Sequence, residues 1–114
     1  MRVLLYYQNQ WGQLIVFDED RWTNHILVNH PELAGQQDAV GLAVVNPSAV
    51  TRDQRHANGL NYYSFGVLTP PLDRVYLKVC VRIEPVAYST SANGLVITAY
   101  PISAIKKTEV PIWP

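Results

Sequence analysis

The chain has 114 residues, of which 48% are hydrophobic and 16% charged, and its nine basic and nine acidic side chains give no formal net charge. This length supports one domain, and the hydrophobic and aromatic content excludes an intrinsically disordered chain. No apolar run is long enough for a membrane-spanning helix and the first residues become polar too early for a secretory signal, so we expect one cytoplasmic domain over residues 1–114.

The charges are unevenly distributed along the chain. Residues 1–51 carry an excess of acidic side chains, and residues 52–114 carry an equal excess of basic ones. Proteins that hold RNA by its phosphates usually carry a basic excess, so the neutral total argues against broad nucleic-acid affinity, while the uneven distribution allows a local basic patch. The lone cysteine, Cys80, excludes an internal disulfide and favours a reducing compartment.

The chain begins with the pattern of a β-hairpin. Short apolar runs of strand length cover residues 3–7 and 14–17, and Trp11 and Gly12 between them have the character of a turn. The two runs are therefore expected to pair with each other.

Two helices are expected next. The acidic residues 18–20 favour the positive end of a helix dipole, and side chains at helical spacing continue from Arg21 to Asn29, before Pro31 disfavours further helix. A second helix is expected over residues 36–46. Its apolar stripe consists of Val40, Ala43 and Val44, widened by Leu42 and Val45.

Strands are expected to fill the second half of the chain. Residues 48–59 are polar and charged and end in a loop, and a Tyr-rich strand follows over residues 60–65. Residues 74–84 alternate strictly between apolar and polar side chains. This period of two is typical of a strand with one face against a core.

A turn over residues 89–94 leads to a further strand, residues 95–100, which Pro101 is expected to end. A hairpin, two helices and then a run of strands is the order of an α+β protein. The sequence therefore predicts an α+β fold, with the N-terminal hairpin and two helices packed on one face of a curved antiparallel sheet.

The polar face of the alternating strand is the first candidate site. Tyr76, Lys78 and Arg82 lie on the side opposite its apolar residues. Thr98 and Tyr100 share one face of the next strand. Two cations, two phenols and a hydroxyl group suit a phosphate or another oxyanion. A solvated polar face without function explains the same pattern and is the commoner case.

The three histidines are candidates for acid–base chemistry, because imidazole titrates near neutral pH. His25 and His30 flank the end of the first expected helix, where each either has a function or packs locally. His56 lies beside Arg55 in a charged loop that suits phosphate contact or plain solvation. No metal or cofactor is expected, because the histidine spacing and the single cysteine fit no metal site and no nucleotide-binding motif is present.

Several segments together resemble the barnase–EndoU–colicin–RelE-like superfamily, and within it the phage- and toxin-associated branch. The resemblance covers about residues 12–113. It implies a small metal-independent ribonuclease, often a bacterial toxin, with helices packed on a curved antiparallel sheet and the active site on the open face of that sheet. The segments are Trp22-Thr23-Asn24-His25-Ile26, His30-Pro31-Glu32-Leu33, Tyr76-Leu77-Lys78-Val79-Cys80-Val81, Val96-Ile97-Thr98-Ala99-Tyr100-Pro101 and Ile112-Trp113.

The resemblance also implies roles for individual residues. His25 is the expected general base, and Thr98 is expected to contact the scissile phosphate. His30 or Tyr100 would protonate the leaving oxygen. The expected substrate-binding residues, which balance phosphate charge or contact bases, are Arg55, Tyr62, Tyr76, Lys78 and Arg82.

The implied reaction is attack of an RNA 2′-hydroxyl on the adjacent phosphorus, which gives a cyclic 2′,3′-phosphate and needs no metal. DNA lacks that hydroxyl, so RNA, for example tRNA or mRNA, is the expected substrate, with Tyr62 or Tyr63 stacked on a base. The expected partners are RNA and an antitoxin or immunity protein, with no membrane. The alternatives are a non-catalytic RNA- or protein-binding module on the same scaffold, which the zero net charge favours, and a small enzyme of another class.

Overall fold

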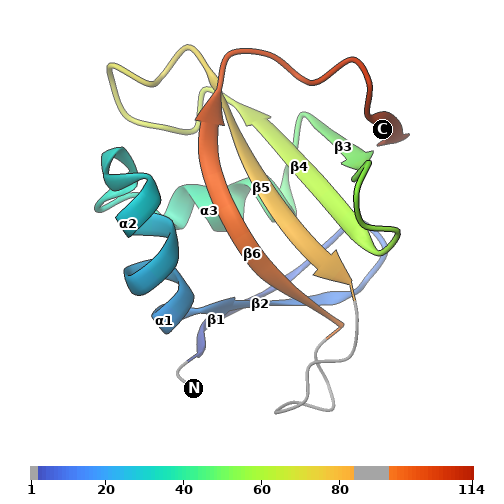
Figure 1. Cartoon of the computed structure of the whole chain (residues 1–114), viewed down its shortest axis with the longest axis horizontal. Helices are drawn as coiled ribbons and strands as arrows, with labels where there is room; N and C mark the ends of the chain where they lie inside the picture. The colour runs from blue at the N-terminus through green and yellow to red at the C-terminus, as the bar shows by residue number, and fades with distance from the viewer. Residues whose placement is uncertain (1–2, 84–92) are drawn as a thin grey trace.

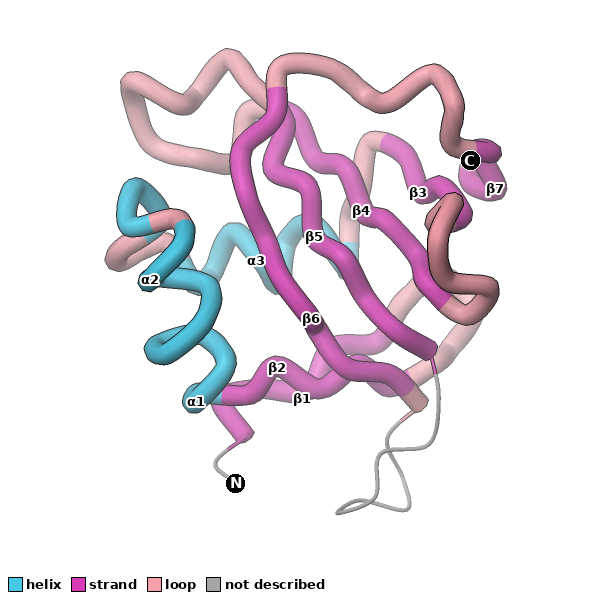
Figure 2. Tube along the Cα trace, viewed as in Figure 1, coloured by secondary structure: helices cyan, strands magenta, loops and turns pink. Residues whose placement is uncertain are grey.

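Seven strands form one curled mixed sheet with the order β1-β2-β6-β5-β4-β3-β7, shown in Figures 1 and 2. The computed structural model describes residues 3–83 and 93–114. The strands are β1 (Val3–Gln8), β2 (Leu14–Asp18), β3 (Ala49–Arg52), β4 (Gly59–Phe65), β5 (Tyr76–Ile83), β6 (Gly94–Ile102) and β7 (Val110–Trp113).

The expected hairpin is present, since β1 and β2 pair antiparallel. The expectation of a purely antiparallel sheet is wrong, because β2 lies parallel to β6, with Ile15 opposite Gly94 and Val16 opposite Leu95. The other neighbouring strands are antiparallel. A parallel pair needs a long crossover between its strands, and here the helices and β3 to β5 supply that connection.

The helices follow the predicted pattern, with one irregular turn. Asp18 caps the first helical segment, since its Oδ1 accepts a hydrogen bond from the backbone N–H of Asp20 at 3.1 Å. This segment ends at Asn29, before Pro31. The helical elements are α1 (Glu19–Arg21), the π-helical turn η1 (Trp22–Ile26), α2 (Leu27–Asn29), the 3₁₀ turn η2 (Pro31–Leu33) and α3 (Gln37–Val45).

The core lies between the helices and one side of the sheet. Figure 1 shows α3 behind β4, β5 and β6, and the α1 to α2 segment beside β6. Gly41 allows a close approach between α3 and β1, because the ring of Tyr7 occupies the place where a Cβ would stand. The predicted stripe of α3 is buried, but Leu42 and Val45 are 53% and 52% exposed, so the expected widening of that stripe is wrong. The buried residues of α3 are Ala39, Val40, Gly41, Ala43 and Val44.

Two strands and one boundary differ from the expectation. Neither β3, formed by residues 49–52, nor β7 was expected, whereas the loop after β3 lies at the end of the 48–59 segment as predicted. Pro101 lies inside β6 opposite Leu77. This is possible because β2 pairs with β6 only at Gly94 and Leu95, so no strand needs a backbone N–H from Pro101 on that side. Glu84 and most of the expected turn over residues 89–94 lie outside the described residues.

Candidate functional site

The face of the central sheet opposite the helices carries a row of polar side chains, and Figure 1 views the sheet from this side. Lys78 on β5 lies opposite Tyr100 on β6, and Cys80 lies opposite Thr98. Arg82 follows on the same face of β5, because side chains alternate along a strand. The structure therefore brings together these residues of the predicted polar face.

A buried ion pair occupies the middle of this face. Nζ of Lys78 lies 2.8 Å from Oε2 of Glu109, which comes from the segment between β6 and β7. The other carboxylate oxygen, Oε1, accepts hydrogen bonds from Thr51 Oγ1 at 2.6 Å, from Tyr63 OH at 2.7 Å and from Asn61 Nδ2 at 3.2 Å. The carboxylate is thus fully engaged.

The pair holds both groups in their charged forms. Burial alone lowers the pKa of Lys78, but its contacts with Glu109 and Tyr63 outweigh burial and raise the pKa above its ordinary value. Burial alone raises the pKa of Glu109, but the hydrogen bonds from Lys78, Thr51 and Tyr63 outweigh it and lower the pKa. Because Lys78 is 3% exposed and already neutralised, the expectation that it balances phosphate charge is wrong.

A hollow of about 220 Å³ opens on the same face, beside this pair. The loop after β3 contributes Asp53, Arg55 and His56, and the sheet contributes Arg82 and Thr98. The pairing of β5 with β6 shifts by one residue between Val96 and Thr98, which is typical of a β-bulge. Two consecutive residues of β6, Ile97 and Thr98, therefore line the hollow. Residues that are distant in the sequence therefore meet at one concave site.

An Asp–His pair lies at the wall of this hollow. Nδ1 of His56 lies 2.8 Å from Oδ2 of Asp53. The same oxygen accepts the backbone N–H of Arg55 at 3.2 Å and that of His56 at 2.9 Å. Burial alone raises the pKa of Asp53, but the hydrogen bonds from His56 and from the two backbone N–H groups outweigh burial and lower the pKa, so this side chain is a carboxylate at neutral pH.

This arrangement fixes how the imidazole of His56 is presented. A carboxylate only accepts hydrogen bonds, so Nδ1 of His56 carries the proton toward Asp53, and in the neutral imidazole the lone pair is then on Nε2. The side chain of His56 is 53% exposed. A carboxylate that orients an accessible imidazole is the usual arrangement for a general base.

The hollow also carries positive charge that nothing described neutralises. Over residues 3–83 and 93–114, neither Arg55 nor Arg82 forms an ion pair. The nearest carboxylate in the hollow, Asp53, is engaged with His56. Two guanidinium groups beside one hydroxyl group, that of Thr98, favour an anionic ligand with several oxygens.

The other two histidines lie apart from the hollow's lining. The ring of His30 stacks on Tyr100, with ring centroids 5.3 Å apart, and its Nδ1 lies 3.6 Å from Oε2 of Glu32. His30 therefore shares the open face with Thr98, which stands two residues before Tyr100. His25 is exposed on η1, and its side chain makes no hydrogen bond or ion pair within the described part of the chain.

The tyrosine candidates differ from the expectation. Tyr62 is 0% exposed in the core and its hydroxyl accepts a hydrogen bond from Nδ2 of Asn9 at 3.0 Å, so it cannot stack on a base. Burial raises the pKa of Tyr62 to about 12. Tyr63 is equally buried. Tyr76 lies at the far end of β5, with its ring against that of Phe65 at a centroid distance of 5.2 Å.

Sequence reasoning missed Asp53 and Glu109 as members of this face, whereas Cys80 lies on the polar side of β5 as the alternation predicts. The Asp53 to His56 spacing has a recognisable signal, because an aspartate that accepts backbone N–H bonds two and three residues later is typical of a turn. Glu109 has no such signal, since its partner is 31 residues away. Burial raises the pKa of the Cys80 thiol, which therefore keeps its proton at neutral pH and is no nucleophile.

Comparison of the chain with models of protein families, with curated proteins and with solved structures finds no match. Among the described residues, no helix has the length and apolar character needed to cross a membrane. The same residues contain no group of three or more His, Cys, Asp or Glu side chains arranged to hold a metal ion.

Proposed function

We propose that this protein is an endoribonuclease that cleaves RNA by attack of the 2′-hydroxyl, without a metal, at the hollow lined by Asp53, His56 and Arg82. One observation carries the proposal: an accessible imidazole, oriented by a carboxylate at 2.8 Å, shares a concave site with a hydroxyl group and two guanidinium groups that form no ion pair with any described residue. General-base catalysis and charge stabilisation are the two requirements of this reaction.

The reaction begins with the 2′-hydroxyl of the substrate. Nε2 of His56 takes its proton, the 2′-oxygen forms a bond to phosphorus, and the bond between phosphorus and the 5′-oxygen breaks. Arg82 and Arg55 bind the non-bridging oxygens, whose charge grows in the transition state, and the hydroxyl of Thr98 donates to the same phosphate. The products are a cyclic 2′,3′-phosphate and a 5′-hydroxyl.

The leaving 5′-oxygen needs a proton, and Tyr100 or the adjacent His30 supplies it. Burial raises the pKa of Tyr100, as does the nearby Cys80, so its phenol holds a proton at neutral pH. Tyr100 lies two residues after Thr98 on the open face, and His30 stacks on its ring. This position supports a role for either side chain at the phosphodiester that Thr98 contacts.

The resemblance to the barnase–EndoU–colicin–RelE-like superfamily supports the same activity on the same face of the sheet. The proposal extends to what this resemblance implies: the hairpin and two helices pack on one face of the sheet, the protein is cytoplasmic, and an antitoxin or immunity protein controls it. The resemblance differs from the geometric argument in the general base, since the resemblance favours His25 and the hollow favours His56. These assignments are separable by mutation.

The test is incubation of the purified chain with total RNA and tRNA in EDTA, followed by mapping of the cut sites and their end groups. We expect cleavage that leaves cyclic 2′,3′-phosphates, and His56→Ala is expected to reduce the rate by about 10²- to 10⁴-fold with unchanged unfolding. The matched variant His25→Ala is expected to keep most of the activity. Cleavage that requires added Mg²⁺ contradicts the proposal.

A second candidate is a non-catalytic RNA-binding module. The neutralisation of Lys78 by Glu109 favours it, because this pairing removes one cation from the open face. Binding of RNA by the wild-type chain without any cleavage, together with unchanged binding by His56→Ala, would support this candidate over the ribonuclease.

A further inference from the structure

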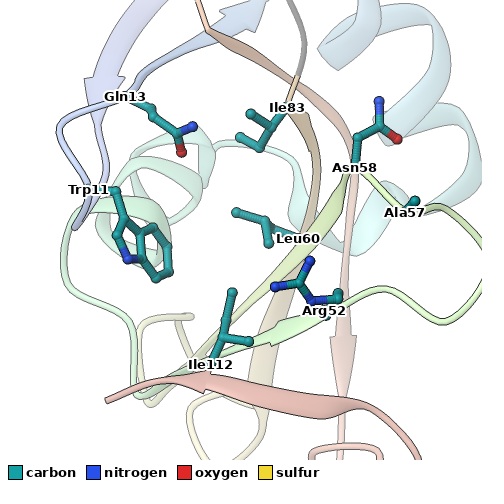
Figure 3. A pocket seen from close by; sticks show the side chains of 8 residues that line it. All are labelled: Trp11, Gln13, Arg52, Ala57, Asn58, Leu60, Ile83 and Ile112. Atoms are coloured by element: carbon teal, nitrogen blue, oxygen red, sulfur yellow. The ribbon is translucent and has the colours of Figure 1, made fainter.

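A second hollow, of about 530 Å³, adjoins the loop that carries His56 (Figure 3). Its floor is apolar and consists of Leu60, Ile83 and Ile112. Figure 3 shows the indole of Trp11 on one side of this floor and the guanidinium of Arg52 on the other. Trp11 is 46% exposed, which leaves a large part of its ring accessible to a ligand.

The second hollow lies back to back with the proposed cleavage site. Leu60 lines the second hollow while the next residue, Asn61, lines the first, and Ile83 and Arg82 are divided in the same way. Neighbouring residues on a strand face opposite sides of a sheet. The two hollows therefore lie on opposite sides of one end of β4 and β5, with the exposed loop of residues 53–58 between them.

The lining of the second hollow suits a flat heteroaromatic ring. Its size and its mostly apolar walls with a few polar groups are typical of sites for small ring systems. The indole of Trp11 offers a stacking surface, and Arg52 makes no ion pair within the described part of the chain. The amide of Gln13 at the rim suits hydrogen bonds to the edge of a base. An aliphatic side chain from a protein partner would leave these polar groups unmatched.

We propose that the second hollow binds the base of a nucleotide adjacent to the phosphate held at the first hollow. This inference rests on the proposed function, because only that function identifies the bound nucleic acid as RNA. A single strand of RNA would cross the loop of residues 53–58, whose side chains at Arg55, His56 and Ala57 are exposed. The base then stacks on Trp11 while Arg55 and Arg82 bind the phosphate.

The test measures binding by calorimetry with 2′-O-methyl dinucleotides, which lack the attacking hydroxyl and are not cleaved. One ligand carries both bases. Each of the other two lacks one base, the first on the 5′ side of the phosphate and the second on the 3′ side. We expect one abasic ligand to bind the wild-type chain about tenfold more weakly than the intact ligand, because a stacked base contributes roughly that factor or more. Trp11→Leu is expected to weaken the intact ligand equally and that abasic ligand no further.

Phe65→Leu is the matched control, because Phe65 is also an exposed aromatic residue on the sheet but lies at the other end of β4. It is expected to leave all three affinities unchanged. Equal binding of intact and abasic ligands, or full binding by Trp11→Leu, overturns the base site whether or not RNA is cleaved. Absence of cleavage of unmodified RNA by the wild-type chain overturns the proposed function, and a base-dependent affinity lost in Trp11→Leu would still establish the base site.

Discussion

Lys78 and Glu109 form an ion pair at 2.8 Å although 31 residues separate them, and both side chains are only 3% exposed. The pair joins the middle of β5 to the segment that precedes β7. Because β7 is the last strand at its edge of the sheet and pairs only with β3 among the described strands, this ion pair is a further attachment for the end of the described chain.

Glu109→Gln is expected to destabilise the fold by about 3–5 kcal/mol, because it leaves the ammonium of Lys78 buried without a counter-charge. Urea unfolding followed by circular dichroism measures this change. Glu32→Gln is the matched control, since Glu32 is exposed and lies 3.6 Å from His30, and its loss should cost at most about 1 kcal/mol. Equal effects of the two substitutions would show that the buried pair contributes no more than a surface contact.

Acid is expected to destabilise the wild-type chain more than Glu109→Gln. The folded-state pKa of Glu109 is lowered from 4.5, so its contribution is fully present above that pH and is lost as the pH falls through the folded value. Lys78 titrates the other way, since its raised pKa keeps its contribution until alkaline pH. Urea midpoints between pH 7 and pH 3 should therefore fall more steeply for the wild type, and parallel curves would contradict the assignment.

Asp53→Asn is expected to lower kcat for RNA cleavage by about 10²- to 10⁴-fold with little change in KM, because an amide no longer selects the His56 tautomer with a free Nε2. Asp53 acts through His56, so it is a positioning residue, and the double variant with His56→Ala should be no slower than His56→Ala alone. Asp73→Asn, in the exposed loop before β5, is the control and should change neither constant. Additive losses in the double variant would contradict the pairing.

Arg82→Gln is expected to weaken RNA binding and to reduce the slope of log affinity against log salt by about 1, because one phosphate contact is lost. Arg55→Gln should act in the same direction. Filter binding of a 2′-O-methyl oligonucleotide between 50 and 200 mM salt, roughly the range in which such contacts are resolved, measures both. Arg74→Gln provides the control, because Arg74 lies two residues before the start of β5, whereas Arg82 lies near the end of that strand. A slope that Arg82→Gln leaves unchanged would remove Arg82 from the phosphate site.

The sequence predicted those elements whose pattern is local. Strict alternation located β5, and helical spacing with Asp18 and Pro31 located the first helical segment. The edge strand β7 was missed because Pro111 has no backbone N–H to donate, and a proline argues against a strand except at the edge of a sheet. The parallel contact between β2 and β6 was missed because no local signal records a pairing between residues so far apart.

The same reason separates the predicted from the unpredicted part of the site. Alternation placed Arg82 and Thr98 correctly on the open face, since it depends only on strand period. It could not show that Lys78 is neutralised, because that depends on where the segment carrying Glu109 returns. The sequence leaves two interpretations for the charged loop that carries His56, namely phosphate contact or plain solvation. Only the fold places that loop against Arg82.

The parallel contact between β2 and β6 also bears on how the chain matures during translation. Asn93 accepts a hydrogen bond from Leu14, and the ribosome adds it 79 residues later. At about 5–20 residues per second, the emerging hairpin waits on the order of 4–16 s for its partner strand. Thr98 follows Asn93 in the sequence, so the candidate site stays incomplete until the ribosome has added both the partner of Leu14 and this hydroxyl group.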